Sequence, residues 1–408
     1  MYKLNILFFC LSFSTKTSKN FYEDLLREFQ MQGHNVYVAC ANEKRSKEKD
    51  GIEDLNGINV LRIRTGNITG TRSLIEKGLS TITIDYLFTK TVFKYWGNIK
   101  FDLILYPTPP ITLAGTVAKV KKRTGAKTYL LLKDIFPQNA IDLGMLKKSG
   151  VKGIIYKYFK RKEKKLYLES DYIGCMSPAN VKYLLHHNDY LDSKNIEVCP
   201  NCEKPLLISY EEKELRDIRN KYNIPQNKKV FVYGGNLGKP QGIEFFLECL
   251  DVCKSEENAF MLVVGGGSEA TKIKSFISEN HIQNARILNE LPKDDYEKLV
   301  CACDVGLVFL DYRFTFPNFP SRILSYMQAS KPVIVATDPN TDMGDIVEKN
   351  GFGWKCLSKN PDEFLFCVRK ALESDLTVMG KIGRRYLEDN YNSKNGFEVI
   401  IKHFKENK

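Results

Sequence analysis

The sequence lacks any apolar run near the ~18 residues that a membrane-spanning helix requires. Its longest apolar stretches, such as Leu4–Leu11, are far shorter, and this excludes a protein that crosses a membrane. We interpret Leu4–Leu11 as a buried first strand and not as a secretory signal, because no small-residue cleavage site follows it.

A disulfide framework is missing as well. The eleven cysteines are scattered over 408 residues, which indicates a reducing compartment, and we expect a cytoplasmic protein.

Metal-binding motifs are also scarce. Cys199-Pro-Asn-Cys202 has a C-x-x-C spacing, but a zinc site needs a second ligand pair. Cys301 and Cys303 lie in a helical pattern with no histidine nearby in the sequence, and no Asp-x-Asp motif is present. We therefore expect neither a metal nor a cofactor.

The composition is that of a folded globular protein. Hydrophobic residues make up 43% and charged residues 27%, a balance that excludes disorder as the main state. A chain of 408 residues is long enough for two domains of about 100–200 residues each. Short apolar runs alternate with amphipathic helical stretches, and the alternation occurs twice. This pattern predicts an α/β fold with two doubly wound Rossmann-like domains that face each other across a cleft.

The predicted strands divide into two groups. They are Leu4–Leu11, Asn35–Ala39, Val60–Ile63, Leu103–Tyr106, Thr128–Leu132 and Tyr172–Met176, then Val230–Tyr233, Phe260–Val264, Ala285–Leu288, Val305–Phe309 and Val333–Ala336. A break is predicted at Cys199–Pro205, where two prolines flank a polar linker. We expect an N-terminal domain over residues 1–200 and a C-terminal domain over 206–376. Helices over 377–408 are expected to pack back on the N-terminal domain.

Positive charge is concentrated in the first half. The net charge is +12, and residues 1–200 hold 32 Lys and Arg against 19 Asp and Glu. Nine of these cations lie in Lys147–Lys165, which contains Glu163 as its single acid. Apolar residues at i, i+3, i+4 and i+7 in the same segment predict an amphipathic helix.

Two interpretations of this basic helix remain open. Its apolar stripe could pack on its own domain while the lysines are merely solvated. Alternatively, the lysines bind anionic lipid head groups, at about 1 kcal/mol for each Lys or Arg near the surface. In that case Lys160, Arg161, Lys164 and Lys165 contact an anionic membrane surface. Nucleic acid is not expected, because no zinc-finger, RNP-like or recognition-helix pattern is present.

Two glycine-rich loops of the second half follow predicted strands. Gly234–Gly242 follows Val230–Tyr233, and Gly265–Ser268 follows Phe260–Val264. Glycines let a backbone approach an anion closely, and amides at a helix start carry partial positive charge. The first loop matches neither the Walker nor the G-x-G-x-x-G spacing, so a plain glycine-rich turn is the alternative to a phosphate site.

Other candidate residues follow neighbouring predicted strands. Ser321 is placed to cap a helix over Arg322–Ala329. The positively charged guanidinium of Arg322 could donate two hydrogen bonds to a phosphate. The alternative is a capped helix with a solvent-facing arginine. In the first half, Asp134 follows Thr128–Leu132 and is either a carboxylate at the cleft edge or a cap for the next helix.

These segments together resemble the family 4 retaining glycosyltransferases of the GT-B fold, in the bacterial capsule and O-antigen branch, and are similar to N-acetylfucosamine-type transferases. The resemblance covers nearly the whole chain. It rests on Gly33-His34-Asn-Val36, Pro107-Thr-Pro-Pro110, Lys133-Asp-Ile-Phe-Pro137, Cys175-Met-Ser-Pro178, Gly235-Asn-Leu-Gly-Lys-Pro-Gln-Gly242, Val263-Val-Gly-Gly-Gly267, Pro320-Ser-Arg-Ile-Leu-Ser-Tyr-Met327 and Lys331-Pro-Val333.

The resemblance implies a metal-independent enzyme that moves an N-acetylated or deoxy hexose from a UDP-sugar to a lipid-linked saccharide. The acceptor would carry a polyprenyl diphosphate and lie at the inner face of the bacterial plasma membrane. The resemblance makes Asp134, Arg322 and Lys239 the catalytic residues. The substrate-binding residues would be Gly235, Asn236, Gly266, Ser321, Ser325, Asn318 and Pro109.

The sequence departs from the family pattern where two glutamates usually stand eight positions apart. Here those positions hold Pro317 and Ser325, so the usual grip on the ribose hydroxyls is missing. Gln241 replaces the family's loop lysine, and Lys239 or Arg322 could supply the charge. A UDP-sugar 2-epimerase of the same fold and a catalytically inactive partner subunit remain alternatives, and the basic segment also permits nucleic-acid binding.

Overall fold

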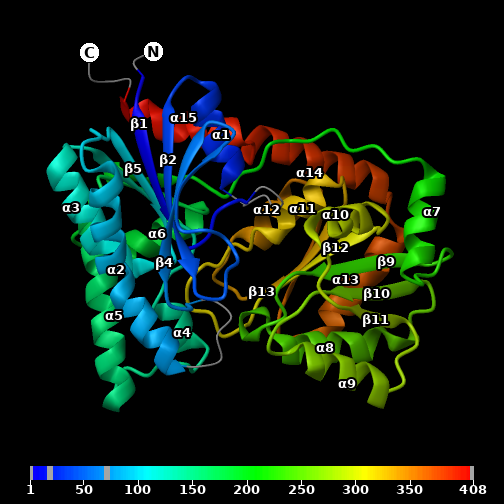
Figure 1. Cartoon of the computed structure of the whole chain (residues 1–408). Coiled ribbons are helices and arrows are strands. Elements are labelled where there is room, and N and C mark those ends of the chain that lie inside the picture. The colour runs from blue at the N-terminus through cyan, green and yellow to red at the C-terminus, as the bar shows by residue number, and fades with distance from the viewer. Residues whose placement is uncertain (1–2, 16–21, 69–73, 405–408) are drawn as a thin grey trace. The chain divides into compact units, whose positions relative to one another are not determined.

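The computed structural model describes residues 3–15, 22–68 and 74–404, which form two compact domains (Figure 1). The first domain consists of the chain up to Lys204 together with the segment from Ser393 onward. The second domain consists of Pro205–Asn392. No helix in the described part of the chain is long and apolar enough to span a membrane.

The first domain is built on an eight-stranded sheet with the order β3-β4-β2-β1-β5-β6-β7-β8. Its strands are β1 (Asn5–Cys10), β2 (Asn35–Glu43), β3 (Gly51–Leu55), β4 (Ile58–Thr65), β5 (Leu103–Pro107), β6 (Lys127–Leu132), β7 (Tyr172–Cys175) and β8 (Ile196–Val198). Neighbouring strands are parallel except β3, which pairs antiparallel with β4. A parallel sheet is covered on both faces, which explains why these strands are apolar almost throughout.

Helices cover both faces of this sheet. They are α1 (Glu23–Met31), α2 (Leu74–Trp96), α3 (Ala114–Thr124), α4 (Gln138–Asp142), α5 (Gly150–Glu169), α6 (Pro178–His187) and α15 (Ser393–Ile401), with the short 3₁₀ turns η1 (Ile111–Leu113) and η5 (Lys402–Phe404). Successive side chains of β1 point to opposite faces. Phe8 joins the core under α1 with Phe29, whereas Phe9 packs on Phe88 of α2 with ring centroids 6.1 Å apart.

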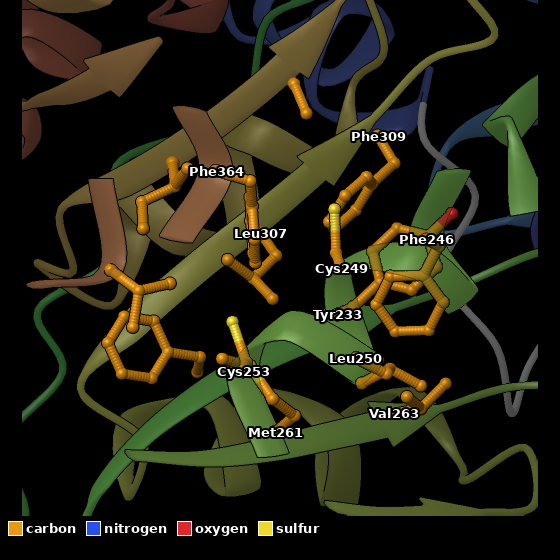
Figure 2. Packing of buried hydrophobic residues seen from close by; sticks show 14 of the residues in the cluster. Tyr233, Phe246, Cys249, Leu250, Cys253, Met261, Val263, Leu307, Phe309 and Phe364 are labelled. Carbon is orange, nitrogen blue, oxygen red and sulfur yellow. The ribbon is translucent and has the colours of Figure 1, made fainter. Parts of the chain in front are cut away.

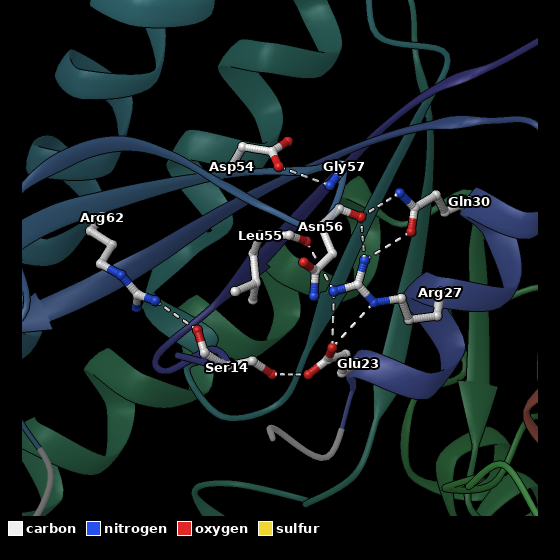
Figure 3. Close-up of polar contacts among 9 residues, drawn as sticks. All are labelled: Ser14, Glu23, Arg27, Gln30, Asp54, Leu55, Asn56, Gly57 and Arg62. Carbon is white, nitrogen blue, oxygen red and sulfur yellow. Dashed lines mark hydrogen bonds and ion pairs between the residues drawn. The ribbon is translucent and has the colours of Figure 1, made fainter. Parts of the chain in front are cut away.

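Polar contacts between α1 and the turn of the β3–β4 hairpin hold this hairpin against the rest of the first domain (Figure 3). Arg27 donates hydrogen bonds to the carbonyl oxygens of Leu55 and Asn56, at 2.9 and 2.8 Å. Its guanidinium is held in turn by Glu23, 3.0 Å away. These contacts satisfy backbone groups at the hairpin turn, where an edge strand would otherwise leave them open.

The second domain contains a six-stranded, fully parallel sheet with the order β11-β10-β9-β12-β13-β14. Its strands are β9 (Lys229–Gly234), β10 (Ala259–Val264), β11 (Ala285–Leu288), β12 (Val305–Phe309), β13 (Val333–Thr337) and β14 (Gly353–Leu357). Its helices are α7 (Glu212–Lys221), α8 (Ile243–Val252), α9 (Ala270–Glu279), α10 (Lys293–Cys301), α11 (Arg322–Gln328), α12 (Met343–Lys349), α13 (Pro361–Glu373) and α14 (Leu376–Asn390). Numbered from β9, this is the Rossmann order 3-2-1-4-5-6.

An aromatic cluster forms the core between this sheet and helices α8 and α13 (Figure 2). The Phe309 ring lies 4.9 Å from the Phe246 ring and 5.4 Å from the Tyr233 ring, centroid to centroid. All three side chains are almost completely buried. Tyr233 is the last residue but one of β9 and Phe309 is the last residue of β12, so this packing anchors the two strands from which the candidate loops depart.

The two C-terminal helices belong to different domains. Helix α14 packs on α11, and Arg384 donates hydrogen bonds to the side chain and backbone oxygens of Gln328 at 2.6 and 3.1 Å. Helix α15 packs on α1, where the Phe397 ring lies 4.8 Å from the Phe29 ring. The prediction that all helices after residue 377 pack on the first domain is therefore wrong for α14, because its polar contacts are with α11.

The sequence predicted both doubly wound sheets, and the structure confirms this fold class. Strands β3 and β14 were not predicted, whereas β8 lies in Ile196–Cys199, a strand-like segment at the predicted break between the domains. Strand β3 mixes Glu53 and Asp54 into a short edge segment, and β14 contains the exposed Lys355 between buried residues. Neither segment shows the apolar run or the strict alternation by which a strand is recognised in a sequence.

Candidate functional site

The second sheet reverses its strand order between β9 and β12, which are neighbours in the sheet. In open α/β sheets, ligands bind outside the carboxyl ends of the strands at such a switch point. Strand β9 ends at Gly234 and β12 at Phe309. The loops that follow these two strands carry most of the candidate residues of the second domain, namely Gly235, Asn236, Lys239, Asn318 and Ser321.

The two glycine-rich loops are bound to each other through their backbones. The amide of Gly235 donates to the carbonyl of Val264 at 2.9 Å, and the amide of Leu237 donates to that of Gly266 at 2.8 Å. A Cβ on Gly265 would lie 2.0 Å from the Gly235 oxygen, and one on Gly267 would lie 2.3 Å from the Leu237 oxygen. Gly265 and Gly267 are therefore needed for the contact between the two loops. Gly235 and Asn236 remain exposed.

Arg322 lies beside the first loop. Its Nη1 donates a 3.0 Å hydrogen bond to the carbonyl of Gly234, and its guanidinium lies 4.7 Å from the centroid of the Tyr233 ring. A Cβ on Gly235 would be 3.8 Å from the guanidinium. Burial raises the pKa of Tyr233 to about 12 even though Arg322 lowers it. The phenol is therefore uncharged near pH 7, and the positive charge of Arg322 stays available to an anion.

Tyr326 fixes the strand ends at the switch point. Its hydroxyl accepts a hydrogen bond from the amide of Gly234 at 3.2 Å and donates one to the carbonyl of Leu307 at 3.1 Å. The side chain is fully buried. Sequence reasoning did not single out Tyr326, although it lies four residues after Arg322, a spacing that places both on one face of a helix.

The segment before α11 differs from its prediction in one respect. Ser321 precedes α11, but its side chain makes no capping hydrogen bond and its φ of −67° and ψ of −14° are already helical. A cap residue normally adopts extended angles, so the prediction that Ser321 caps this helix is wrong. Ser321, Ser325 and Asn318 are all half-buried, and the Asn318 carbonyl accepts a 2.7 Å hydrogen bond from Thr341.

Lys239 and Gln241 have different roles in the loop after β9. Both belong to the short turn η3 (Lys239–Gln241). Gln241 accepts a 3.0 Å hydrogen bond from the amide of Gly238, which stabilises the turn. The side chain of Lys239 is exposed and makes no hydrogen bond or ion pair with the described residues. Lys239 is therefore the cation of this turn that can reach a ligand.

Two buried carboxylates near this edge were missed by sequence reasoning. Asp311 follows β12 and holds Arg313 in a bidentate ion pair at 2.8 and 2.6 Å. Asp338 follows β13, and burial raises its pKa to about 6. Its Oδ1 accepts hydrogen bonds from the amides of Asn340 and Thr341. The signal was an acidic residue two positions after the end of a predicted strand, which is also the position of Asp134.

The candidate residues of the first domain lie at the ends of β5 and β6. Thr108 joins the two loops, since its hydroxyl donates to the carbonyl of Asp134 at 2.9 Å and accepts from the Asp134 amide at 3.1 Å. Pro109 is the exposed residue next to it. The Asp134 carboxylate accepts a 2.7 Å hydrogen bond from the side chain of Asn139. Helix α4 begins without a side-chain cap, so Asp134 does not have the capping role that was the alternative.

Asp134 is expected to make the stability of the first domain depend on pH. Burial raises its pKa from 3.8 to about 6. Because the folded pKa is the higher one, this contribution to stability is fully present below pH 3.8 and is lost as the pH rises through about 6. We expect a loss of up to about 2 kcal/mol, reduced from the full shift because the side chain is only half-buried.

Unfolding in urea of the wild type and Asp134→Asn, at a pH below about 4 and near pH 7, measures this effect. The variant should gain stability relative to the wild type as the pH rises. Asp189→Asn, at an exposed position of the same domain, is the control and should show no such trend. A pH-independent difference between Asp134→Asn and the wild type would contradict the raised pKa.

The structure brings some of the candidate residues of the second domain together. Gly235 lies beside Arg322, Asn236 follows Gly235 in the same loop, and Gly266 is bonded to that loop. Asp134 and Pro109 form the group of the first domain. Among the described residues, no cluster of three or more His, Cys, Asp or Glu side chains is arranged to hold a metal ion.

Comparisons with known proteins give the site a context. Residues 215–386 match the family described as glycosyl transferases group 1. A relative from Pseudomonas aeruginosa, described as the probable glycosyltransferase WbjE, is 28% identical over 326 residues, covering 78% of this chain and 77% of its own. A second relative is WcaI of Escherichia coli strain K12, with the description of a colanic acid biosynthesis glycosyl transferase. It is 21% identical over 325 residues, covering 79% of this chain and 78% of its own.

Solved structures share the fold over nearly the whole chain. Sucrose-phosphate synthase from Thermosynechococcus elongatus matches with a TM-score of 0.77 and 14% identity, covering 99% of both chains. Alr3699/HepE of Anabaena, solved with UDP and glucose, matches with a TM-score of 0.71 and 13% identity, covering 98% of this chain and 99% of its own. These likenesses show the GT-B fold with its two Rossmann-like domains. Together with the family match and the relatives, they support a glycosyltransferase.

Proposed function

We propose that this protein is a retaining glycosyltransferase that moves an N-acetylated or deoxy hexose from a UDP-sugar to a lipid-linked saccharide during capsule or O-antigen assembly. The observation that carries the proposal is the position of Arg322 at the switch point of the second sheet. Its guanidinium lies beside the exposed Gly235, whose own amide is bonded to Val264, so a diphosphate there would meet the fixed positive charge of Arg322. Both relatives are described as glycosyltransferases, and the description of one places it in colanic acid biosynthesis.

The proposed role of this group is to stabilise the leaving diphosphate. The bond between the anomeric carbon and the phosphate oxygen breaks, and negative charge accumulates on the departing UDP. Arg322 and Lys239 stabilise this charge more strongly than the intact donor, which lowers the barrier to transfer. The acceptor hydroxyl attacks from the same face, and its proton passes to the leaving phosphate oxygen. Arg322 and Lys239 supply the positive charge that a divalent metal ion would otherwise provide. We therefore expect the transferase activity to be unchanged when EDTA removes metal ions.

The first-domain group is proposed to bind the acceptor. Asp134 has a raised pKa of about 6 and can accept a hydrogen bond from a sugar hydroxyl while it is ionised near pH 7. Pro109 is exposed on the neighbouring loop and offers a rigid surface to a saccharide. The acceptor is proposed to carry a polyprenyl diphosphate, because the excess of basic residues lies in the same half of the chain.

Donor recognition must differ from the usual family pattern at the ribose. Pro317 is buried and offers no side-chain hydrogen bond, and Ser325 is half-buried one turn beyond Arg322. We propose that Ser325 and Ser321 provide hydroxyl contacts to the donor in place of a carboxylate. The exposed Glu290 is a further candidate, since its carboxylate would be 3.7 Å from a Cβ on Gly266, beside the expected nucleoside.

Thermal unfolding in the presence of nucleotides tests the donor class. UDP at a hundred times its Kd is expected to stabilise the protein by about 2.7 kcal/mol, which corresponds to a rise in Tm of about 5–11 °C for a domain of this size. ADP and GDP at the same concentration should raise Tm by much less. A panel of UDP-sugars then identifies the donor as the sugar that gives the largest additional rise.

Two results would overturn the proposed function. Equal stabilisation by all nucleoside diphosphates would argue against a UDP-specific donor site. Conversion of UDP-N-acetylglucosamine to its 2-epimer without any acceptor would indicate the epimerase instead. Slow hydrolysis of a UDP-sugar by the protein alone would support the transferase, because water can replace a missing acceptor, and it would argue against an inactive subunit.

A further inference from the structure

Helix α5 exposes apolar side chains that its amphipathic pattern suggested would be buried. Val151, Ile154 and Ile155 are 78%, 70% and 43% exposed. Further along the helix the same stripe turns into the domain, where Phe159 meets Phe136 with ring centroids 4.9 Å apart. The apolar stripe of α5 therefore packs on its own domain only in its second part. Its first part presents branched aliphatic side chains to the surroundings.

Helix α2 shows a similar feature at its own beginning. Leu79, Ile82 and Tyr86 are 62%, 59% and 64% exposed, and their spacing places them on one stripe of the helix. The opposite stripe, which includes Ile84 and Phe88, is fully buried against the sheet. The buried stripe, and not the exposed one, therefore provides the packing of α2 on the sheet.

The helices that carry the two stripes lie on one side of the first sheet. Helices α2, α3 and α5 all cover the same face of the sheet (Figure 1). Both α2 and α5 contact η1, and the carboxylate of Asp85 on α2 is close enough to Tyr158 on α5 to add to the rise in its pKa, which is due first to burial. Each helix follows a strand of the parallel sheet, so each begins at the carboxyl edge of that sheet.

Exposed lysines flank the apolar side chains of α5 in the sequence. Lys147, Lys148, Lys152 and Lys157 are exposed and make no ion pair with the described residues. The one acid of this segment, Glu163, is buried and pairs with Lys160 and Tyr167, so it does not offset the others. Of the cations first expected to contact lipid, Lys160 is engaged by Glu163 and Lys164 lies 4.5 Å from the centroid of the Tyr190 ring. Arg161 and Lys165 are exposed.

We propose that this surface, formed by Leu79, Ile82, Tyr86, Val151, Ile154 and Ile155 with the lysines at 147, 148, 152 and 157, docks on an anionic phospholipid bilayer. The apolar side chains enter the boundary between head groups and acyl chains, and the lysines bind lipid phosphates. This inference deepens the proposed function, because a lipid-linked acceptor is presented at such a surface. Docking itself requires neither the donor nor the transfer reaction.

The combination of charges and apolar groups selects this partner over others. Nucleic acid would be attracted by the lysines, but its phosphates gain nothing from exposed isoleucine and valine side chains. A second protein copy would bring the same lysines into mutual repulsion across a two-fold interface. An anionic bilayer satisfies both parts of the surface at once, since its head groups are negative and its interior is apolar.

Sedimentation of the full-length protein with vesicles tests the proposal. Vesicles of equal parts phosphatidylglycerol and phosphatidylethanolamine should bind the protein, and pure phosphatidylcholine vesicles should bind it only weakly. The triple substitution of Lys147, Lys148 and Lys152 by Gln should weaken binding to the anionic vesicles about a hundredfold at low salt. The double substitution Ile82→Ser and Ile154→Ser should weaken it about tenfold, and the effect should persist at high salt.

Matched controls come from the second domain. The control for charge replaces the exposed Lys213, Lys274 and Lys381 by Gln, and the control for apolar side chains combines Phe366→Ser with Val378→Ser. Both should leave vesicle binding unchanged. All substituted side chains are exposed, so equal melting temperatures verify that the variants are folded. Since no nucleotide is used, UDP binding by the same variants tests the donor site independently.

Four outcomes would overturn the proposal. The wild type could remain in solution with the anionic vesicles, or bind both kinds of vesicles equally. The control variants could lose binding as strongly as the test variants. Finally, the isoleucine substitutions could abolish a dimer while vesicle binding is absent, which would make this surface a contact between copies of the chain.

Discussion

Replacement of Arg322 by alanine is expected to weaken UDP binding about thirtyfold and to lower kcat by a further factor of about 100. A hydrogen bond to a charged group contributes about 1.5–3 kcal/mol, and its loss accounts for the weaker binding. The further effect on kcat arises because charge on the diphosphate grows as the glycosyl bond breaks, and a fixed guanidinium stabilises that charge most in the transition state. Calorimetry with UDP and turnover of a UDP-sugar measure the two effects separately.

The control experiments must separate binding from folding, because Arg322 also bonds the carbonyl of Gly234 and stacks on Tyr233. Arg322→Lys keeps the charge but loses the planar fork, and we expect it to recover part of the UDP affinity. Arg385→Ala, in which an exposed arginine of the same domain is removed, should leave affinity and kcat unchanged. Equal UDP affinity of Arg322→Ala and the wild type would remove Arg322 from the donor site.

The sequence predicted the fold class because both sheets are parallel and buried, so their central strands are apolar over their whole length. The C-terminal helices were predicted less well. Helix α14 is amphipathic like α15, and its periodicity shows that it has an apolar face without showing which domain covers it. That choice depends on side-chain partners such as Gln328, which Arg384 meets across a separation of 56 residues. Contacts of this kind have no signature in a single sequence.

A single sequence shows residue types and local patterns but not contacts between distant residues. This explains which residues of the candidate site were predicted and which were missed. Arg322 and the glycines were recognised because they follow predicted strands, and their type suits an anion. Tyr326 was missed, since its role depends on the positions of Gly234 and Leu307, which lie far from it in the sequence. For α5, the periodicity predicted an apolar stripe correctly, but only the packing shows that Val151 and Ile154 are left outside.

Gly265→Ala is expected to destabilise the second domain by about 3 kcal/mol and to abolish UDP binding. Gly265 has a φ of +153°, a conformation that residues with a side chain rarely adopt, and an added Cβ would lie 2.0 Å from the carbonyl oxygen of Gly235. The first loop cannot keep its bond to Val264 and also make room for the methyl group. Thermal unfolding should show a drop in Tm of about 6–12 °C, and calorimetry should detect no UDP.

Gly266→Ala provides the matched comparison at the adjacent position. The nearest side-chain atom to its Cβ would be an oxygen of Glu290 at 3.7 Å, an ordinary van der Waals distance, so stability should change by less than about 0.5 kcal/mol. If the nucleoside lies against Gly266, the methyl group occupies its place, and UDP binding weakens while Tm stays the same. A Gly265→Ala protein with the Tm and UDP affinity of the wild type would show that the two loops need not touch. The phosphate site assigned to them would then lose part of its structural basis, because the contact between the loops, together with the bond from Arg322 to Gly234, holds the Gly235 backbone beside Arg322.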